Sequence, residues 1–222
     1  TTNFQVLHGM EQLAGLAVQR LMEDGYGFGG EGDWKTAGLV RLMKIMTNNT
    51  RTSFMEDYTY NFEPGNEMIL GAHMLEVCPT VAANKPLIEV KHLGIGDKAA
   101  PARLIFNGQA GSAVCASLID LGGRMRLIIN EVEAKEVEKD LPQLPVARVL
   151  WRPEPSLKVG AKAWILAGGA HHTSFSYELD SEQLTDLANM YGIESVVIGK
   201  DTNIKEFEKE LKWNDLYWRL NR

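Results

Sequence analysis

Glutamate and histidine residues between Thr52 and Pro79 have the types and spacing to bind a divalent metal ion. This stretch, TSFMEDYTYNFEPGNEMILGAHMLEVCP, holds two runs rich in β-branched and aromatic residues around the turn sequence EPGN. Such a pattern predicts a β-hairpin. If the hairpin folds about its Pro-Gly bond, Glu56 lies opposite His73. Cross-strand partners have Cβ atoms about 5 Å apart, so a carboxylate and an imidazole can ligate one ion.

Strand alternation predicts which side chains surround this pair. Phe54, Glu56 and Tyr58 share one face of the hairpin with Gly71 and His73. The face is mostly apolar, and Gly71 leaves room beside the two polar groups. A buried hydrogen bond between glutamate and histidine is the structural alternative, and a β-bulge would break the pairing.

A glycine-rich loop earlier in the chain presents another carboxylate. The segment GYGFGGEGD, residues 25–33, has five glycines in nine residues. Its spacing fits neither of the glycine-rich nucleotide motifs. We expect the glycines to let the backbone approach closely and to hold Glu31 at the loop tip, before a helix capped by Asp33. An exposed glutamate without function is the alternative.

The histidines differ in what they can do. His8 and His92 stand alone and are interpreted as structural. His171 and His172 are adjacent, and on an extended segment adjacent side chains point to opposite faces, so one of them is expected to reach a metal while the other supports it. The candidate ligand set is Glu31, Glu56, His73 and one of the pair. Two carboxylates and two imidazoles suit Mn²⁺, with Co²⁺ as an alternative, better than structural zinc.

Composition excludes several functional classes. The 222 residues carry a net charge of -6 without a basic stripe, which argues against nucleic-acid binding. No apolar run approaches the roughly 18 residues of a membrane span, and no signal peptide is present, so we expect a cytoplasmic protein. Cys78 and Cys115 lack metal spacing and resemble small buried hydrophobic residues of a reducing compartment, with a disulfide as the alternative.

The elements that must position these residues change in character near residue 50. Residues 1–50 are helical in pattern, with apolar stripes Leu13/Leu16/Ala17/Leu21 and Leu39/Leu42/Met43/Ile45/Met46. Short strand-like runs then follow without intervening helices, which favours an antiparallel barrel or sandwich. The runs are 52–62, 67–78, 87–93, 102–106, 113–120, 124–133, 147–151 and 162–167.

After residue 173 the pattern becomes helical again. Ser181 begins a capped helix that ends at Gly192, and a buried strand follows at 193–198. The last amphipathic helix is expected over 204–216. Its inward residues would be Phe207, Leu211 and Leu216, and Trp213, Tyr217 and Trp218 would pack against the barrel.

Several long blocks resemble the L-arabinose isomerase family, in the same order and over essentially the whole chain. They are GYGFGGEGDWKTAGLVRLMK, TSFMEDYTYNFEPGNEMILGAHMLEVCP, HLGIG followed by PARLIFN, LPQLPVARVLW, and AWILAGGAHHTSFS. The resemblance implies manganese ligands at Glu31, Glu56, His73 and His172, with His171 as a neighbour of the ligand. It also implies sugar-pocket positions, which are Phe4, Tyr58 and Ile95.

The resemblance further implies a domain plan. The fold class is α+β, in which the last helices of a central α/β (Rossmann-like) domain, residues 1–50, precede a C-terminal antiparallel β-barrel with flanking helices, residues 51–222. The family's N-terminal domain is absent from this chain. In the family's trimer or hexamer, that domain lends pocket residues to a neighbouring subunit.

The implied reaction interconverts L-arabinose and L-ribulose, and D-galactose and D-tagatose in many relatives. Glu31 and Glu56 would be the acid–base pair, and the metal would stabilise the developing enediol. Two other classes stay open. A glycosidase would use the same two carboxylates about 5–9 Å apart without metal, and a sugar-binding module would bind sugar without turnover.

Overall fold

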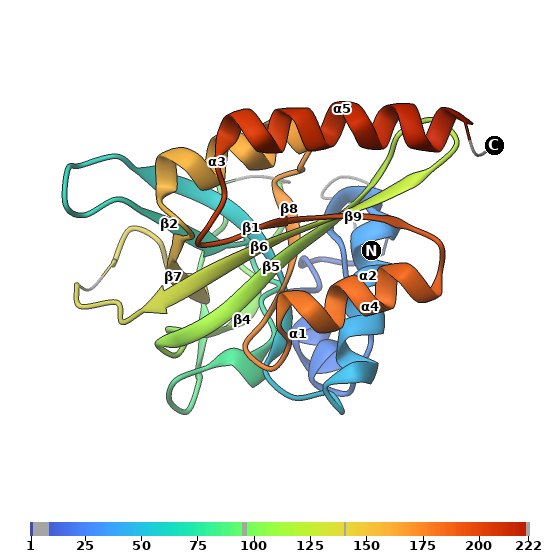
Figure 1. Ribbon diagram of the computed structural model, residues 1–222. Coiled ribbons are helices and arrows are strands. Elements are labelled where there is room, and N and C mark those ends of the chain that lie inside the picture. The colour runs from blue at the N-terminus through green and yellow to red at the C-terminus, as the bar shows by residue number, and fades with distance from the viewer. Residues whose placement is uncertain (2–8, 95–96, 140, 221–222) are drawn as a thin grey trace.

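The computed structural model describes residues 1, 9–94, 97–139 and 141–220 (Figure 1). The helices are α1 (Gly15–Glu23), α2 (Trp34–Met46), α3 (Leu157–Ala167), α4 (Ser181–Met190) and α5 (Ile204–Leu220), with 3-10 turns at Gly30–Gly32 and Pro79–Val81. The strands are β1 (Thr52–Asn61), β2 (Met68–Ala72), β3 (Leu87–Val90), β4 (Ala102–Ile105), β5 (Gly111–Asp120), β6 (Met125–Lys135), β7 (Arg148–Pro153), β8 (His172–Ser176) and β9 (Glu194–Ile198).

Within the described residues, six strands close into an antiparallel barrel. Their order is β5-β8-β1-β2-β7-β6, and β6 pairs back onto β5. Strand β9 joins β6 in parallel, and β3 and β4 form a separate hairpin. The α+β fold class with a C-terminal antiparallel barrel and flanking helices is therefore confirmed, and the barrel is the correct choice over the sandwich.

Helices cover the barrel on separate sides. Helices α3 and α5 pack together over one side, and α4 lies along β9 (Figure 1). Helix α2 packs against β1, β5 and β8, so the loop that precedes α2 lies close to these strands. Asp33 caps α2 by accepting a hydrogen bond from the backbone N–H of Thr36, as the sequence predicts.

The core fills the barrel interior. Trp151 and Phe175 are both buried there, with ring centroids 5.7 Å apart. Gly71 lies directly against the Trp151 ring, so any Cβ at this position would collide with the indole. The prediction that Gly71 makes room beside Glu56 and His73 is therefore wrong, because Gly71 faces the core.

The hairpin register contains a bulge. Tyr60 pairs with Ile69, which agrees with folding about the Pro-Gly bond, but the register shifts by one residue between Asp57 and Thr59. Glu56 consequently lies opposite Ala72, and the predicted Glu56–His73 pairing is wrong. An extra residue turns all side chains beyond it to the other face.

Three segments differ from the predicted secondary structure. Residues 73–78, the second half of the predicted strand 67–78, form no strand, since β2 ends at Ala72. Residues 162–167 are the end of α3 and not a strand, since the Ser156 side chain caps this helix and Gly168, with φ 92°, ends it. Short apolar runs do not distinguish buried helices from strands by periodicity. Strand β8 was not among the predicted strands, since the pattern was interpreted as helical after residue 173; its polar residues, including Ser174 and Ser176, are buried and obscure the usual apolar pattern.

The N-terminal helices bury only part of their predicted stripes. Leu13, Leu39 and Met43 are buried, whereas Leu21 is 47% exposed and Ile45 is 57% exposed.

On α5, Phe207 and Leu211 are buried, as predicted. Leu216, Trp213 and Tyr217 are exposed, so the expectation that they face inward is wrong. An ion-pair network instead ties this end of α5 to the barrel, where Asp215 contacts Arg124.

Cys78 and Cys115 are free and buried, as expected of small hydrophobic residues. No helix in the described ranges is long and apolar enough to cross a membrane.

Candidate metal centre

The loop before α2 holds Glu31 in an unusual backbone conformation. A Cβ atom on Gly27 would collide with the carbonyl oxygen of Ala37, and a Cβ atom on Gly29 would collide with the carbonyl oxygen of Asp33. These glycines therefore permit the close approach of the loop backbone to α2 that the sequence predicts. Glu31 itself has φ 58° and ψ 31°. This left-handed conformation is uncommon for residues other than glycine, and such residues cluster at functional sites.

Three strands bring further candidate ligands toward this loop. Glu56 in β1 and His172 in β8 are direct cross-strand partners. His73 follows the last residue of β2 and is buried. The ring of Phe54 contacts both imidazoles edge-on, with centroid distances of 4.9 Å to His73 and 5.1 Å to His172. Phe54 thus fixes the two rings from the core side.

The candidate ligand atoms converge. Among the described residues, Glu31, His171 and His172 form a group whose ligand atoms all lie within 4.8 Å of one another. The rings of His171 and His172 are 4.4 Å apart, so the expectation that alternation separates them is wrong, because His171 precedes the strand. The His73 ring lies 5.6 Å from that of His172. Glu56 interacts electrostatically with Glu31, His73 and His171.

Gly30 leaves space between the imidazoles. A Cβ at this position would lie 3.1 Å from Nε2 of His73 and 3.3 Å from Cε1 of His172. Any side chain here would therefore crowd both rings on the side that faces the Glu31 loop.

Burial and neighbouring charges set the protonation of the site. Burial raises the pKa of Glu56 above its usual value. Burial also acts to lower the pKa of His73, but the hydrogen bond and charge of Glu76 outweigh it and raise this pKa overall. The pKa of His172 is lowered, because burial and the nearby rings of His171 and His73 disfavour its charged form.

Asp33 and Glu76 also belong to the site, although the sequence analysis did not identify either carboxylate as functional. Nδ1 of His172 is 3.2 Å from Oδ2 of Asp33, and Nδ1 of His73 is 2.5 Å from Oε2 of Glu76. Asp33 was interpreted only as the residue that caps α2, and Glu76 lay within a predicted strand. The distance in sequence between Asp33 and His172 left no local pattern that could reveal their contact.

A hollow adjoins the centre. Its volume is about 460 Å³, and its lining includes Glu31, His172 and the polar residues Lys35, Ser117 and Asp120, which sequence reasoning also missed. Pockets for small ligands have this order of size.

Of the predicted sugar-pocket residues, Tyr58 is 38% exposed at the bulge beside Glu56. Its role stays a prediction. Phe4 and Ile95 lie outside the described residues.

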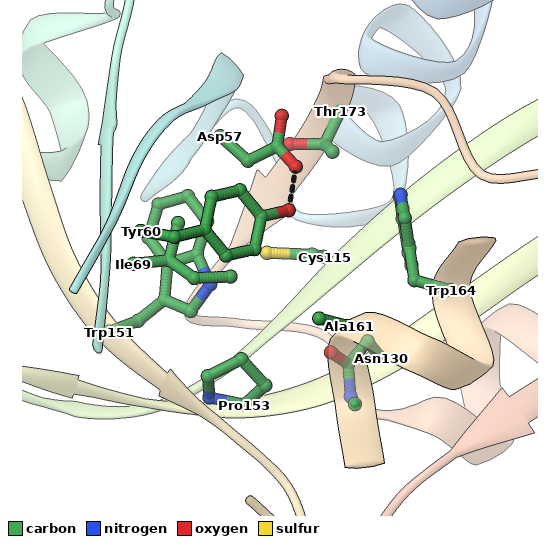
Figure 2. Close-up of a pocket in the computed structure, with 11 residues that line it drawn as sticks. Asp57, Tyr60, Ile69, Cys115, Asn130, Trp151, Pro153, Ala161, Trp164 and Thr173 are labelled. Atoms are coloured by element: carbon green, nitrogen blue, oxygen red, sulfur yellow. Dashed lines mark hydrogen bonds between the residues drawn. The ribbon is translucent and has the colours of Figure 1, made fainter. Parts of the chain in front are cut away.

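The side chain of Asp57 points away from the centre, into a small pocket inside the barrel (Figure 2). It accepts a hydrogen bond from the hydroxyl of Tyr60, and Cys115 and Thr173 line the same pocket. Burial raises the pKa of Asp57 to about 6. Strand alternation thus places Glu56 and Asp57 on opposite faces of β1, one in the site and one in the core, and the bulge that follows brings Tyr60 onto the same face as Asp57.

Comparison with known proteins identifies the family. Residues 51–194 match the L-arabinose isomerase C-terminal domain, and residues 1–49 match the L-arabinose isomerase central domain. The chain belongs to the L-arabinose isomerase family. It is 69% identical over its whole length to the L-arabinose isomerase of Bacillus subtilis, and 67% identical over 99% of its length to that of Geobacillus kaustophilus. The chain spans 45% and 44% of the lengths of these two family members.

Proposed function

We propose that this chain supplies the metal-binding and acid–base residues of an isomerase that interconverts L-arabinose and L-ribulose, and D-galactose and D-tagatose. The observation that carries the proposal is the convergence of Glu31, His172 and neighbouring Glu56 and His73 from four separate segments. Membership of the L-arabinose isomerase family supports the choice of substrate.

The residues present fit a divalent cation. Glu31, Glu56, His73 and His172 would hold it, a donor set that suits Mn²⁺, with Co²⁺ as the alternative. The space beside Gly30 and the absence of thiolate ligands among these donors agree with such an ion. When bound, the ion would supply Lewis-acid stabilisation of negative charge on the sugar oxygens.

The two carboxylates would move the protons. Isomerisation removes a proton from the carbon beside the carbonyl, delivers a proton to the former carbonyl carbon, and moves a hydroxyl proton from one oxygen to the other, through an enediol. Burial raises the pKa of Glu56, so this carboxyl group holds a proton more tightly than an exposed glutamate does. Glu31, at the tip of an exposed loop, can reach a sugar in the adjoining hollow. Phe54 keeps water from the inner side of the imidazoles.

We further propose that residues outside this chain complete the pocket. The chain corresponds to less than half of its relatives' length. The family's preceding domains and a neighbouring subunit of a trimer or hexamer would close the open side of the hollow, in a cytoplasmic enzyme.

A metal-dependence assay tests the proposed function. L-ribulose formation should be measured for this chain, alone and extended by the N-terminal part of the Bacillus subtilis relative, after EDTA treatment and after addition of Mn²⁺ or Co²⁺. We expect turnover in the extended protein that EDTA abolishes and Mn²⁺ restores, and that is lost in Glu56→Gln. Hydrolysis of glycosides without metal would favour the glycosidase alternative, and sugar binding without turnover would favour the binding module.

A further inference from the structure

Each of the two buried histidines proposed as ligands contacts a carboxylate through its Nδ1 atom. Asp33 lies against His172, and Glu76 lies against His73. We infer that Asp33 and Glu76 are positioning residues, which hold both imidazoles in the tautomer whose Nε2 is free to bind a metal. The inference rests on the proposed metal site.

The tautomer follows from the chemistry of the contact. An ionised carboxylate can only accept hydrogen bonds, so Nδ1 must carry the hydrogen, and a neutral imidazole then presents a lone pair at Nε2. In His73, Nε2 lies toward Gly30, in the loop that carries Glu31. The free lone pair of His73 is therefore directed to the place where the other proposed ligand atoms gather.

Other contacts fix both carboxylates independently of the histidines. Oδ1 of Asp33 accepts the backbone N–H of Thr36 at 3.1 Å, and Oδ2 accepts the Thr36 hydroxyl at 2.6 Å. Oε2 of Glu76 accepts the backbone N–H of Leu75 at 2.9 Å, and Glu76 is only 3% exposed. The anchors are thus rigid, and each supports one ring at a defined angle.

Variants of Asp33 separate helix capping from control of the tautomer. Asp33→Ser keeps a side-chain acceptor for the start of α2 but is too short to reach His172. Asp33→Asn also keeps the cap through its oxygen, and its NH₂ group then faces Nδ1 of His172 as a donor. This arrangement forces the hydrogen onto Nε2. We expect the dissociation constant for Mn²⁺ to rise about 10–100-fold in the serine variant and further in the asparagine variant.

Asp180 provides a matched control. It caps α4 by accepting the backbone N–H of Gln183, and it does not contact the proposed ligands. Asp180→Asn should leave Mn²⁺ affinity unchanged. If replacing any capping aspartate by asparagine altered Mn²⁺ affinity, the affinity would change in both asparagine variants.

Glu76 variants test the second anchor. In Glu76→Gln the amide oxygen can still accept from Nδ1 of His73 and from the N–H of Leu75, so we expect Mn²⁺ affinity to fall less than about tenfold. Glu76→Leu removes this acceptor and should reduce affinity about 10–100-fold. If glutamine preserves Mn²⁺ affinity and leucine does not, Glu76 acts by orienting the His73 ring and not through its negative charge.

Nuclear magnetic resonance of the histidine rings tests the inference directly. Two-bond ¹H–¹⁵N correlation spectra of the metal-free chain, recorded at about pH 8.5 where imidazole is ordinarily neutral, should show the Nδ1–H tautomer for His73 and His172. In Asp33→Asn, His172 should change to Nε2–H. Mn²⁺ titrations of the same samples, followed by electron paramagnetic resonance, should then give the order of affinities stated above.

The outcomes separate this inference from the proposed function. An Nε2–H tautomer at either histidine of the parent chain, or equal Mn²⁺ affinity in the two asparagine variants, would overturn the anchoring roles. If the parent shows Nδ1–H at both rings but neither it nor any variant binds Mn²⁺, the anchors stand and the proposed metal site falls.

Discussion

At the level of single residues, one side chain is strongly affected by its surroundings although it is outside the proposed chemistry. Asp57 lies inside the barrel, in a pocket that Tyr60 and Cys115 also line, and Glu56 and His171 act on it electrostatically. Burial raises its pKa from 3.8 to about 6. The folded state therefore binds a proton more tightly than the unfolded state, and folding stability from this group is lost as the pH rises through this interval.

We predict that Asp57→Asn removes this pH dependence. In the parent chain the free energy of unfolding should fall by at most about 3 kcal/mol between pH 4 and pH 6 through this group, and asparagine should flatten the decline. Urea unfolding with EDTA present measures the effect, and Asp186→Asn on the exposed face of α4 serves as control. An unchanged pH profile in Asp57→Asn would show that Asp57 keeps its ordinary acidity.

Residue types alone identified some members of the site and not others. Glu31 could be singled out because glycines surround it, and the pair His171 and His172 because they are adjacent. His73 was singled out through a pairing with Glu56 that the structure does not show. Asp33 and Glu76 could not, since their partners are chosen by the folded arrangement of α2, β8 and the end of β2. The choice between His171 and His172 came from family resemblance, and their rings lie side by side.

At the level of elements, the β-bulge in β1 decides which side chains enter the site. It lies between Asp57 and Thr59, and it was invisible in a hairpin pattern that otherwise predicted the outer register correctly. Glu56 is also held by its pairing with His172 in β8. The position of Glu56 therefore depends on the bulge and on β8 more than on the distant turn.

Deleting the bulge residue should disable the centre. Removal of Tyr58 restores regular alternation, which forces either Glu56 out of the site or Tyr60 out of the core. We expect Mn²⁺ affinity to fall at least about 100-fold, since one of four proposed ligands is lost. Inserting a glycine between Pro64 and Gly65 is the control and should leave affinity unchanged. Equal affinity in the deletion variant and the parent would show that the bulge is not needed to hold Glu56 in the site.

Whole elements were predictable where local signals were strong. The predicted cap at Asp33 is confirmed at the start of α2, whereas the cap signal assigned to Ser181 belongs to Asp180, one residue earlier, at the start of α4. The strand runs predicted most of the barrel. Strand β8 was missed because all of its residues are buried and several are polar, and helix α3 was missed because the exposed apolar residues Ile165 and Leu166 obscure its amphipathic pattern. Closure of the barrel depends on the pairing of β8 with β1 and β5, two strands distant from it in the sequence, which no local pattern specifies.

At the level of the whole molecule, large apolar side chains remain exposed in several places. The helical region 15–46 exposes Leu21, Trp34 and Ile45, and strand β3 exposes Leu87 and Ile88. A further stripe on α5 consists of Trp213, Leu216, Tyr217 and Leu220. Clusters of exposed apolar side chains mark surfaces that another protein chain or domain normally covers.

We predict that the chain self-associates at micromolar concentration. Sedimentation velocity should show species larger than a monomer of 24.7 kDa, and the dye ANS should bind with increased fluorescence. Polar substitutions in the α5 stripe, such as Trp213→Gln with Tyr217→Gln, should weaken the association. A stable monomer that does not bind ANS would show that these surfaces are not interfaces with other protein chains.

The most direct test is whether one Mn²⁺ ion is held by His172 and not by its neighbour. Electron paramagnetic resonance titration of this chain should show one bound ion in the parent and none in His172→Ala. His171→Ala should keep binding within about 10–100-fold of the parent, the usual effect of losing a supporting side chain. Equal loss of Mn²⁺ affinity in the two variants, or unaltered binding in His172→Ala, would contradict the proposed centre.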